Sequence, residues 1–75
     1  MVKLRIKMGT NLVKDVEVHV DDPLYILLDK LDITDKHVKF LFNRATYPIA
    51  SILTFGEIGI NSDCTIILIN RAIAG

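Results

Sequence analysis

The residue that could most readily take part in a reaction is the last one, Gly75. A terminal glycine has no Cβ, so it can pass through a narrow channel and present its carboxylate to an activating enzyme. The carboxylate is inert until it is converted to an acyl-adenylate, which can become a thioester or a sulfur-donating thiocarboxylate. We therefore expect Gly75 to be the point of activation and conjugation. The alternative is that position 75 is only where a longer chain has been cut.

The other reactive side chains lack the partners that catalysis requires. Cys64 is the only cysteine and follows Asp63 rather than a cation, so nothing in its neighbourhood should lower the thiol pKa. His19 and His37 are far apart and share no metal-ligand spacing with Cys64. No phosphate-binding loop, nucleophile elbow or histidine-glutamate metal motif occurs. The sequence predicts a protein that is not an enzyme and needs no cofactor or metal.

Composition limits the class of partner. The chain has 75 residues, enough for one domain, and its nine basic residues balance its nine acidic ones, which argues against a nucleic-acid partner. With 51% hydrophobic residues it is more apolar than a small core needs, so some apolar side chains should be exposed. No signal peptide or membrane-spanning run is present, and no intramolecular disulfide can form. We expect a cytoplasmic or nuclear protein with no membrane partner.

Hydrophobic periodicity predicts the elements that position these residues. Apolar and polar residues alternate over 2–7 and again over 16–20, which indicates an antiparallel hairpin. Asp22 and Pro23 are typical of a helix start, with Asp22 as the N-cap, and leucines at helical spacing continue to Leu31. The remaining predicted elements are a strand at 38–42, an extended piece at 47–49, a helical turn at 54–58 ended by Gly59, a tight turn at 61–63, a strand at 65–69 and a loose tail at 70–75.

The element order predicts an α+β fold, ββαββ, in which one helix packs across a mixed sheet of four to five strands. Residues 1–75 form a single domain with a flexible tail at 70–75. The predicted core residues that pack against the helix are Leu4, Ile6, Val18, Phe40, Ile66 and Leu68.

Three large apolar residues fall on the opposite face of this sheet. Ile67 and Ile69 alternate with inward-pointing neighbours, and Leu41 lies between two inward-pointing phenylalanines. The solvent side of an antiparallel sheet is normally polar. An exposed apolar patch of this kind is typical of a partner site. The alternatives are incidental exposure, or burial by another domain of the same polypeptide.

The last third of the chain carries a family resemblance. The segment 53–69, LTFGEIGINSDCTIILI, resembles the T-L-x-E-L-G-I-x-x-G-D-T-I-x-L-V stretch of ubiquitin-like domains, and FLFN at 40–43 resembles the preceding L-I-F-N-G. The resemblance implies the ubiquitin-like β-grasp fold. It also implies that Leu41, Ile67 and Ile69 form the family's shared binding patch, with Met8 nearby. The basic border of this patch would be Lys39, Arg5, Lys7 and Arg71.

Two departures keep three functions open. The link 32–37, between the predicted helix and the third predicted strand, is short, and the chain ends in Ala74-Gly75 rather than Gly-Gly. The short link and the ending also resemble those of the sulfur carriers of thiamine and molybdopterin synthesis. The first expectation is a covalent modifier attached through Gly75. The second is an interaction domain excised from a larger protein, and the third is a sulfur carrier. The implied partners are activating and conjugating enzymes, or receptors for ubiquitin-like domains, and we expect a monomer.

Overall fold

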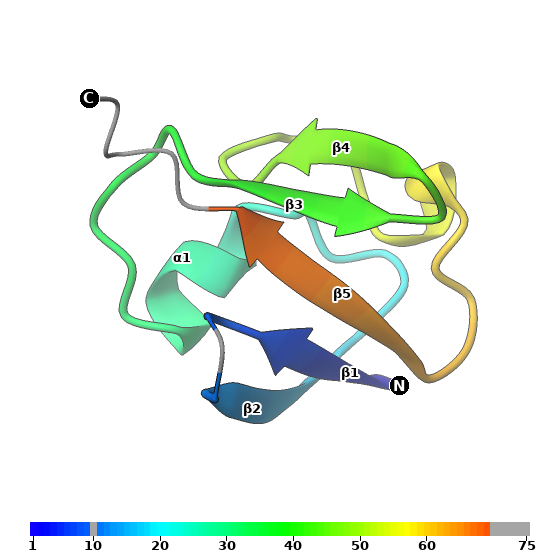
Figure 1. The fold of residues 1–75 in the computed structure, drawn as a ribbon. Helices are drawn as coiled ribbons and strands as arrows, with labels where there is room; N and C mark the ends of the chain where they lie inside the picture. Colours follow the sequence, from blue (N-terminus) through cyan, green and yellow to red (C-terminus); the bar gives the residue numbers. More distant parts are fainter. Residues whose placement is uncertain (10, 70–75) are drawn as a thin grey trace.

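Five strands form one mixed sheet in the order β2-β1-β5-β3-β4 (Figure 1). The computed structural model describes residues 1–9 and 11–69. The strands are β1 (Val2–Lys7), β2 (Val13–Val18), β3 (Lys39–Phe42), β4 (Ala45–Pro48) and β5 (Cys64–Ile69). The central strands β1 and β5 run parallel, and the other neighbours are antiparallel. The predicted α+β class is confirmed, with the larger of the two expected strand numbers.

The first hairpin follows the predicted alternation. In β1, Val2, Leu4 and Ile6 are buried and the residues between them are exposed. The second strand ends at Val18 instead of continuing to Val20. Val18 already pairs with Val2, the first residue of β1, so no residue of β1 remains as a partner for Val20. The carbonyl of Val20 instead accepts a hydrogen bond from the amide of Gly56 at 2.8 Å.

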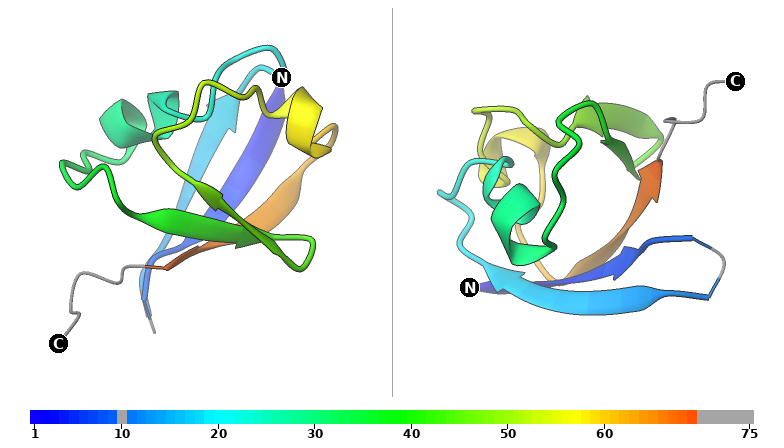
Figure 2. Two further views of the ribbon diagram at one scale, coloured as in Figure 1. Left: turned by 90° about the horizontal axis from the view of Figure 1, so that it is seen from above. Right: turned by 90° about the vertical axis from the view of Figure 1, so that its left-hand side faces the viewer.

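The helix α1 (Ile26–Lys30) lies across one face of the sheet (Figure 2). Its apolar stripe is buried as predicted, since Leu24, Leu27 and Leu31 are at most 3% exposed. These leucines fill the space between the helix and the sheet, and α1 therefore anchors one side of the core.

The predicted helix start was wrong. Asp22 does not cap the helix: its carboxylate accepts a hydrogen bond from the amide of His19 at 3.0 Å. Its carbonyl accepts one from Phe55 at 3.1 Å, and Pro23 forms an isolated bridge with Thr54. The residues that looked like a helix start are therefore held by a segment distant in the sequence, and the helix proper begins at Ile26.

The segment after β3 contains a second hairpin where a loop with a short extended piece was predicted. Asn43 and Arg44 form the two-residue turn, with φ values of 53° and 66°. Positive φ at both central residues is the geometry that matches the twist of paired strands. The turn therefore brings β4 back beside β3 and adds the fifth strand.

The predicted helical turn is the 3₁₀ helix η1 (Gly56–Ile58). Thr54 and Glu57 cap it reciprocally: the Thr54 amide donates to the Glu57 carboxylate at 2.8 Å, and the Glu57 amide donates to the Thr54 hydroxyl at 3.1 Å. Gly59 ends it with a φ of 97°, a conformation that favours glycine. This prediction is confirmed.

The core lies between α1, η1 and the inner face of the sheet. Five of the six predicted core residues are at most 1% exposed, and Leu68 is only half-buried. The buried apolar side chains are Val2, Leu4, Ile6, Val18, Leu24, Leu27, Leu31, Val38, Phe40, Ile49, Phe55, Ile60 and Ile66.

Candidate functional site

The outer face of the sheet carries the predicted apolar residues close together. Leu41 on β3 pairs in register with Ile67 on β5, and Ile69 is the next outward residue of β5. Ile67 is 41% exposed, whereas Leu41 and Ile69 are half-buried. The predicted strand parity is therefore confirmed. We call Leu41, Ile67 and Ile69 the sheet patch.

Two lysines border the sheet patch. Lys7 pairs in register with Ile67 from one side, and Lys39 pairs with Ile69 from the other. Both are exposed, and neither forms an ion pair with any residue of the described part of the chain. Arg5 lies further along β1, and its guanidinium is 3.4 Å from the carboxylate of Asp15. Among residues 1–9 and 11–69, the positive charge nearest the patch therefore comes from the two lysines.

A shallow hollow of about 420 Å³ lies at the edge of the sheet patch. It is lined by Ile69 and Lys39 together with His37 and Thr46. Sequence reasoning missed His37 and Thr46, because the pairing of Thr46 with Leu41 depends on the β3–β4 hairpin. An apolar side chain of a partner can enter this hollow beside Ile69.

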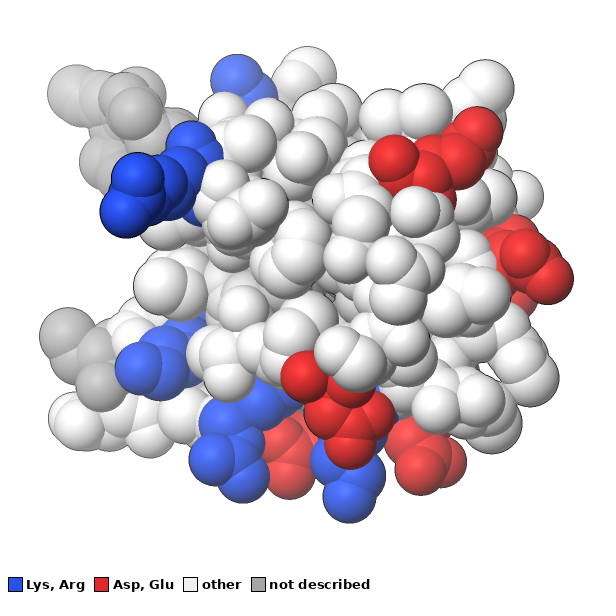
Figure 3. All heavy atoms as spheres, turned by 90° about the vertical axis from the view of Figure 1, so that its right-hand side faces the viewer, with Lys and Arg blue, Asp and Glu red and all other residues white. Residues whose placement is uncertain are grey.

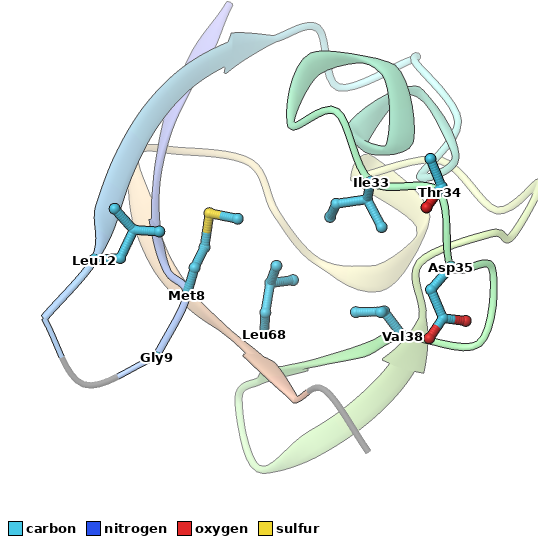
Figure 4. A pocket seen from close by; sticks show the side chains of 8 residues that line it. All are labelled: Met8, Gly9, Leu12, Ile33, Thr34, Asp35, Val38 and Leu68. Atoms are coloured by element: carbon cyan, nitrogen blue, oxygen red, sulfur yellow. The ribbon is translucent and has the colours of Figure 1, made fainter. Parts of the chain in front are cut away.

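Met8 is not part of this surface. It continues the inward parity of Leu4 and Ile6 and packs beside the core. Figure 4 shows it with Leu68 in a pocket of about 560 Å³ between the first hairpin and the loop after α1. The expectation that Met8 joins the patch was therefore wrong, and extending the alternation of β1 by one more residue would have predicted the correct side.

The other two predicted site residues, Arg71 and Gly75, lie outside the described residues, as does the whole predicted tail at 70–75. The structure therefore places the three members of the sheet patch and Met8. The roles of Arg71, Gly75 and the tail remain predictions.

The arrangement of strands and helix matches known structures. The solution NMR structure of a ubiquitin-like domain of an Arabidopsis thaliana protein superimposes with a TM-score of 0.79. The match covers 99% of this chain and 81% of that one, at 18% sequence identity. This chain has the ubiquitin-like fold. No protein-family model matches the sequence, and no curated protein matches it either.

The ubiquitin-like fold is typically non-enzymatic, and the one cysteine of this ubiquitin-like chain is not activated. Partial burial raises the pKa of the Cys64 thiol above its ordinary value, and the charge of Asp63 raises it further. The thiol is therefore protonated at neutral pH and is a poor nucleophile.

Neither a metal centre nor a membrane helix is found in the described ubiquitin-like domain. No group of three or more histidine, cysteine, aspartate or glutamate side chains within residues 1–9 and 11–69 could hold a metal ion. Within the same ranges, α1 and η1 are both too short to cross a membrane.

Proposed function

We propose that this ubiquitin-like module is a protein-recognition module that binds other proteins through the sheet patch. The observation that supports this is the outward exposure of large aliphatic side chains at the centre of the sheet, where solvent normally favours polar residues. Ile67 gains nothing for folding from its exposed surface, but that surface is available for burial under a partner.

The border of the patch indicates the chemistry of the partner. Lys7 and Lys39 present positive charge on both sides of Ile67 and Ile69. A partner surface with apolar residues at its centre and carboxylates at its edge would match both features. The hollow beside Ile69 gives one of its apolar side chains a place to insert.

The test compares Ile67→Ser with Leu12→Ser, the same kind of change at a leucine that is 50% exposed outside the sheet patch. Proteins captured from lysate by the wild-type chain are identified, purified and titrated into labelled chain. We expect Ile67→Ser to weaken binding by tenfold or more and Leu12→Ser to leave it unchanged. Shifted amide resonances should cluster on β3 and β5. Equal binding by both variants would contradict the proposal.

We propose further that the module is a covalent modifier attached through Gly75. This rests on the family resemblance and on the missing Cβ of a terminal glycine. The Gly75 carboxylate would attack the α-phosphate of ATP, releasing pyrophosphate, and the adenylate would pass to an enzyme cysteine with loss of AMP. A lysine amine would then displace that cysteine and form an isopeptide bond.

One experiment separates this from the two alternatives. The chain is incubated with ATP and host lysate, or with a purified activating enzyme, and its mass is measured. A conjugate supports the modifier, a thiocarboxylate supports the sulfur carrier, and an unchanged chain supports an interaction domain of a larger protein. The similar Arabidopsis structure is itself described as a domain of a protein, which agrees with the last alternative. Removal of Gly75 should abolish any activation of the chain.

The cytoplasm or the nucleus is the proposed location of the protein.

A further inference from the structure

A second exposed apolar surface lies next to the helix. Tyr25 is 49% exposed, Ile52 83% and Leu53 42%. We call these three residues the helix patch. None of them belongs to the sheet, so this surface is separate from the sheet patch.

The helix patch is fixed by main-chain pairing. The amide of Tyr25 donates to the carbonyl of Ser51 at 3.1 Å, and the amide of Leu24 donates to the carbonyl of Leu53 at 2.8 Å. These bonds and the Pro23–Thr54 bridge hold residues 23–25 antiparallel to residues 51–54. Exposed apolar residues on a backbone held in this way need little ordering when they bind, which lowers the entropic cost of association.

The charge near the helix patch is opposite to that near the sheet patch. The two segments that carry the helix patch, 20–31 and 49–60, contain four carboxylates and one lysine. Asp29 is exposed one helical turn after Tyr25, and Glu57 is exposed three residues after Thr54, whose amide it binds. In Figure 3, acidic side chains occupy the right side of the view, basic side chains occupy the left, and both occur along its lower edge.

We propose that the helix patch binds the sheet patch of a second copy of this chain. Apolar surface would meet apolar surface, and the carboxylates around one patch would meet Lys7 and Lys39 at the other. The formal net charge of zero removes the overall repulsion that keeps many small proteins apart. This inference rests on the proposed role of the sheet patch and names one partner for it.

The contact is head-to-tail, because it joins two different surfaces. A linear assembly keeps a free sheet patch at one end and a free helix patch at the other, so it grows into a chain or closes into a ring. Each patch consists of three apolar residues, so the contact belongs to the small, weak class of interfaces and forms only at high concentration. The monomer expected from the sequence is then the form present at low concentration, and assemblies form as the concentration rises. Binding of another protein to the sheet patch would compete with self-association.

The test uses sedimentation velocity over a range of concentrations with complementary variants. One variant reverses the border of the sheet patch, Lys7→Glu with Lys39→Glu, and the other removes the most exposed residue of the helix patch, Ile52→Ser. Leu12→Ser is the matched control, because Leu12 is 50% exposed and belongs to neither patch. Thermal melts establish that each variant is folded.

We expect the wild type and Leu12→Ser to increase in mean mass with concentration, and less so at high salt, where charges are screened. Each of the other variants alone should stay monomeric. Their mixture should form a one-to-one dimer and nothing larger, because only one intact helix patch can meet one intact sheet patch. A symmetric contact, in which each copy presents the same surface, would not give this pattern.

A wild type that stays monomeric at millimolar concentration would overturn the inference, as would a mixture that does not dimerise. In either case, loss of partner binding in Ile67→Ser with normal binding in Leu12→Ser would leave the proposed function standing. Failure of the proposed function itself is recognised separately, when Ile67→Ser binds captured proteins as well as the wild type does.

Discussion

Ile66 and Ile67 are the same residue type at adjacent positions of β5, yet their surroundings are opposite. Ile66 is 0% exposed and pairs in register with Ile6 on the inner face, whereas Ile67 is 41% exposed and lies between Lys7 and Leu41 on the outer face. Alternating residues of one strand thus have different surroundings: inner residues stabilise the fold, and outer residues form the proposed binding surface. The two roles can therefore be changed independently.

The largest effect is expected from Ile66→Ala. It removes buried methyl and methylene groups and leaves a cavity against Ile6, so it should lower the free energy of unfolding by about 2–5 kcal/mol. A domain of this size has only a few kcal/mol in reserve, so this loss is comparable with its whole stability. Urea denaturation followed by circular dichroism measures the change. A loss below about 1 kcal/mol would contradict the assignment of Ile66 to the core.

Leu68→Ala should have a smaller effect, although Leu68 also faces inward. Its side chain is half-buried and borders the open pocket beside Met8, so its removal enlarges an existing space rather than creating a closed cavity. We expect a loss of about 1–2 kcal/mol, in proportion to its smaller buried area. The same denaturation experiment tests this. A cost equal to that of Ile66→Ala would mean that the pocket is closed in solution.

Ile67→Ser should change the stability least among the three, by no more than about 1 kcal/mol, because Ile67 is 41% exposed on the outer face and its truncation leaves no closed cavity. Its effect on partner binding should be large, as proposed above. If Ile67→Ser destabilised the fold as much as Ile66→Ala, the outer face would be part of the core, and the comparison between the two isoleucines would fail.

Much of this arrangement could be predicted from sequence periodicity. The parity of β5 follows from alternation, and the turn before Gly59 follows from residues that act locally. The start of α1 could not be predicted, because the Asp22 carbonyl accepts a hydrogen bond from Phe55 and Pro23 lies opposite Thr54 in an isolated bridge. Both partners are distant in the sequence.

The helix patch was missed for a similar reason. Ile52 and Leu53 form an apolar run with Phe55, and the sequence does not tell which members of such a run are buried. Phe55 is fully buried whereas Ile52 is almost fully exposed, a difference set by the pairing of this loop with the start of the helix. Local patterns thus predict the elements, and tertiary pairing decides which apolar residues remain outside.

Cys64, the first residue of β5, lies on the same face of the sheet as Ile66, and the pKa of its thiol reports how buried that face is. Burial is the larger cause of its raised pKa, and the charge of Asp63 is the smaller. Asp63→Asn removes that charge but keeps an oxygen that can accept the hydrogen bond from the Lys3 amide, now 2.9 Å long. We expect the variant to lower the Cys64 pKa but to leave it above the ordinary value. The pH dependence of alkylation by iodoacetamide measures this.

The sign of the linked stability follows from the same shift. A thiol whose pKa is higher in the folded state than in the unfolded state contributes stability that is fully present below the unfolded pKa. That contribution is lost as the pH rises through the folded pKa, so the wild type should lose stability on the alkaline side and Asp63→Asn should lose less. Cys64→Ala, which cannot ionise, is the control and should remove this part of the pH dependence. In Asp63→Asn, an alkylation midpoint equal to that of an ordinary cysteine would show that burial does not raise the Cys64 pKa, and would contradict an inner-face position for Cys64.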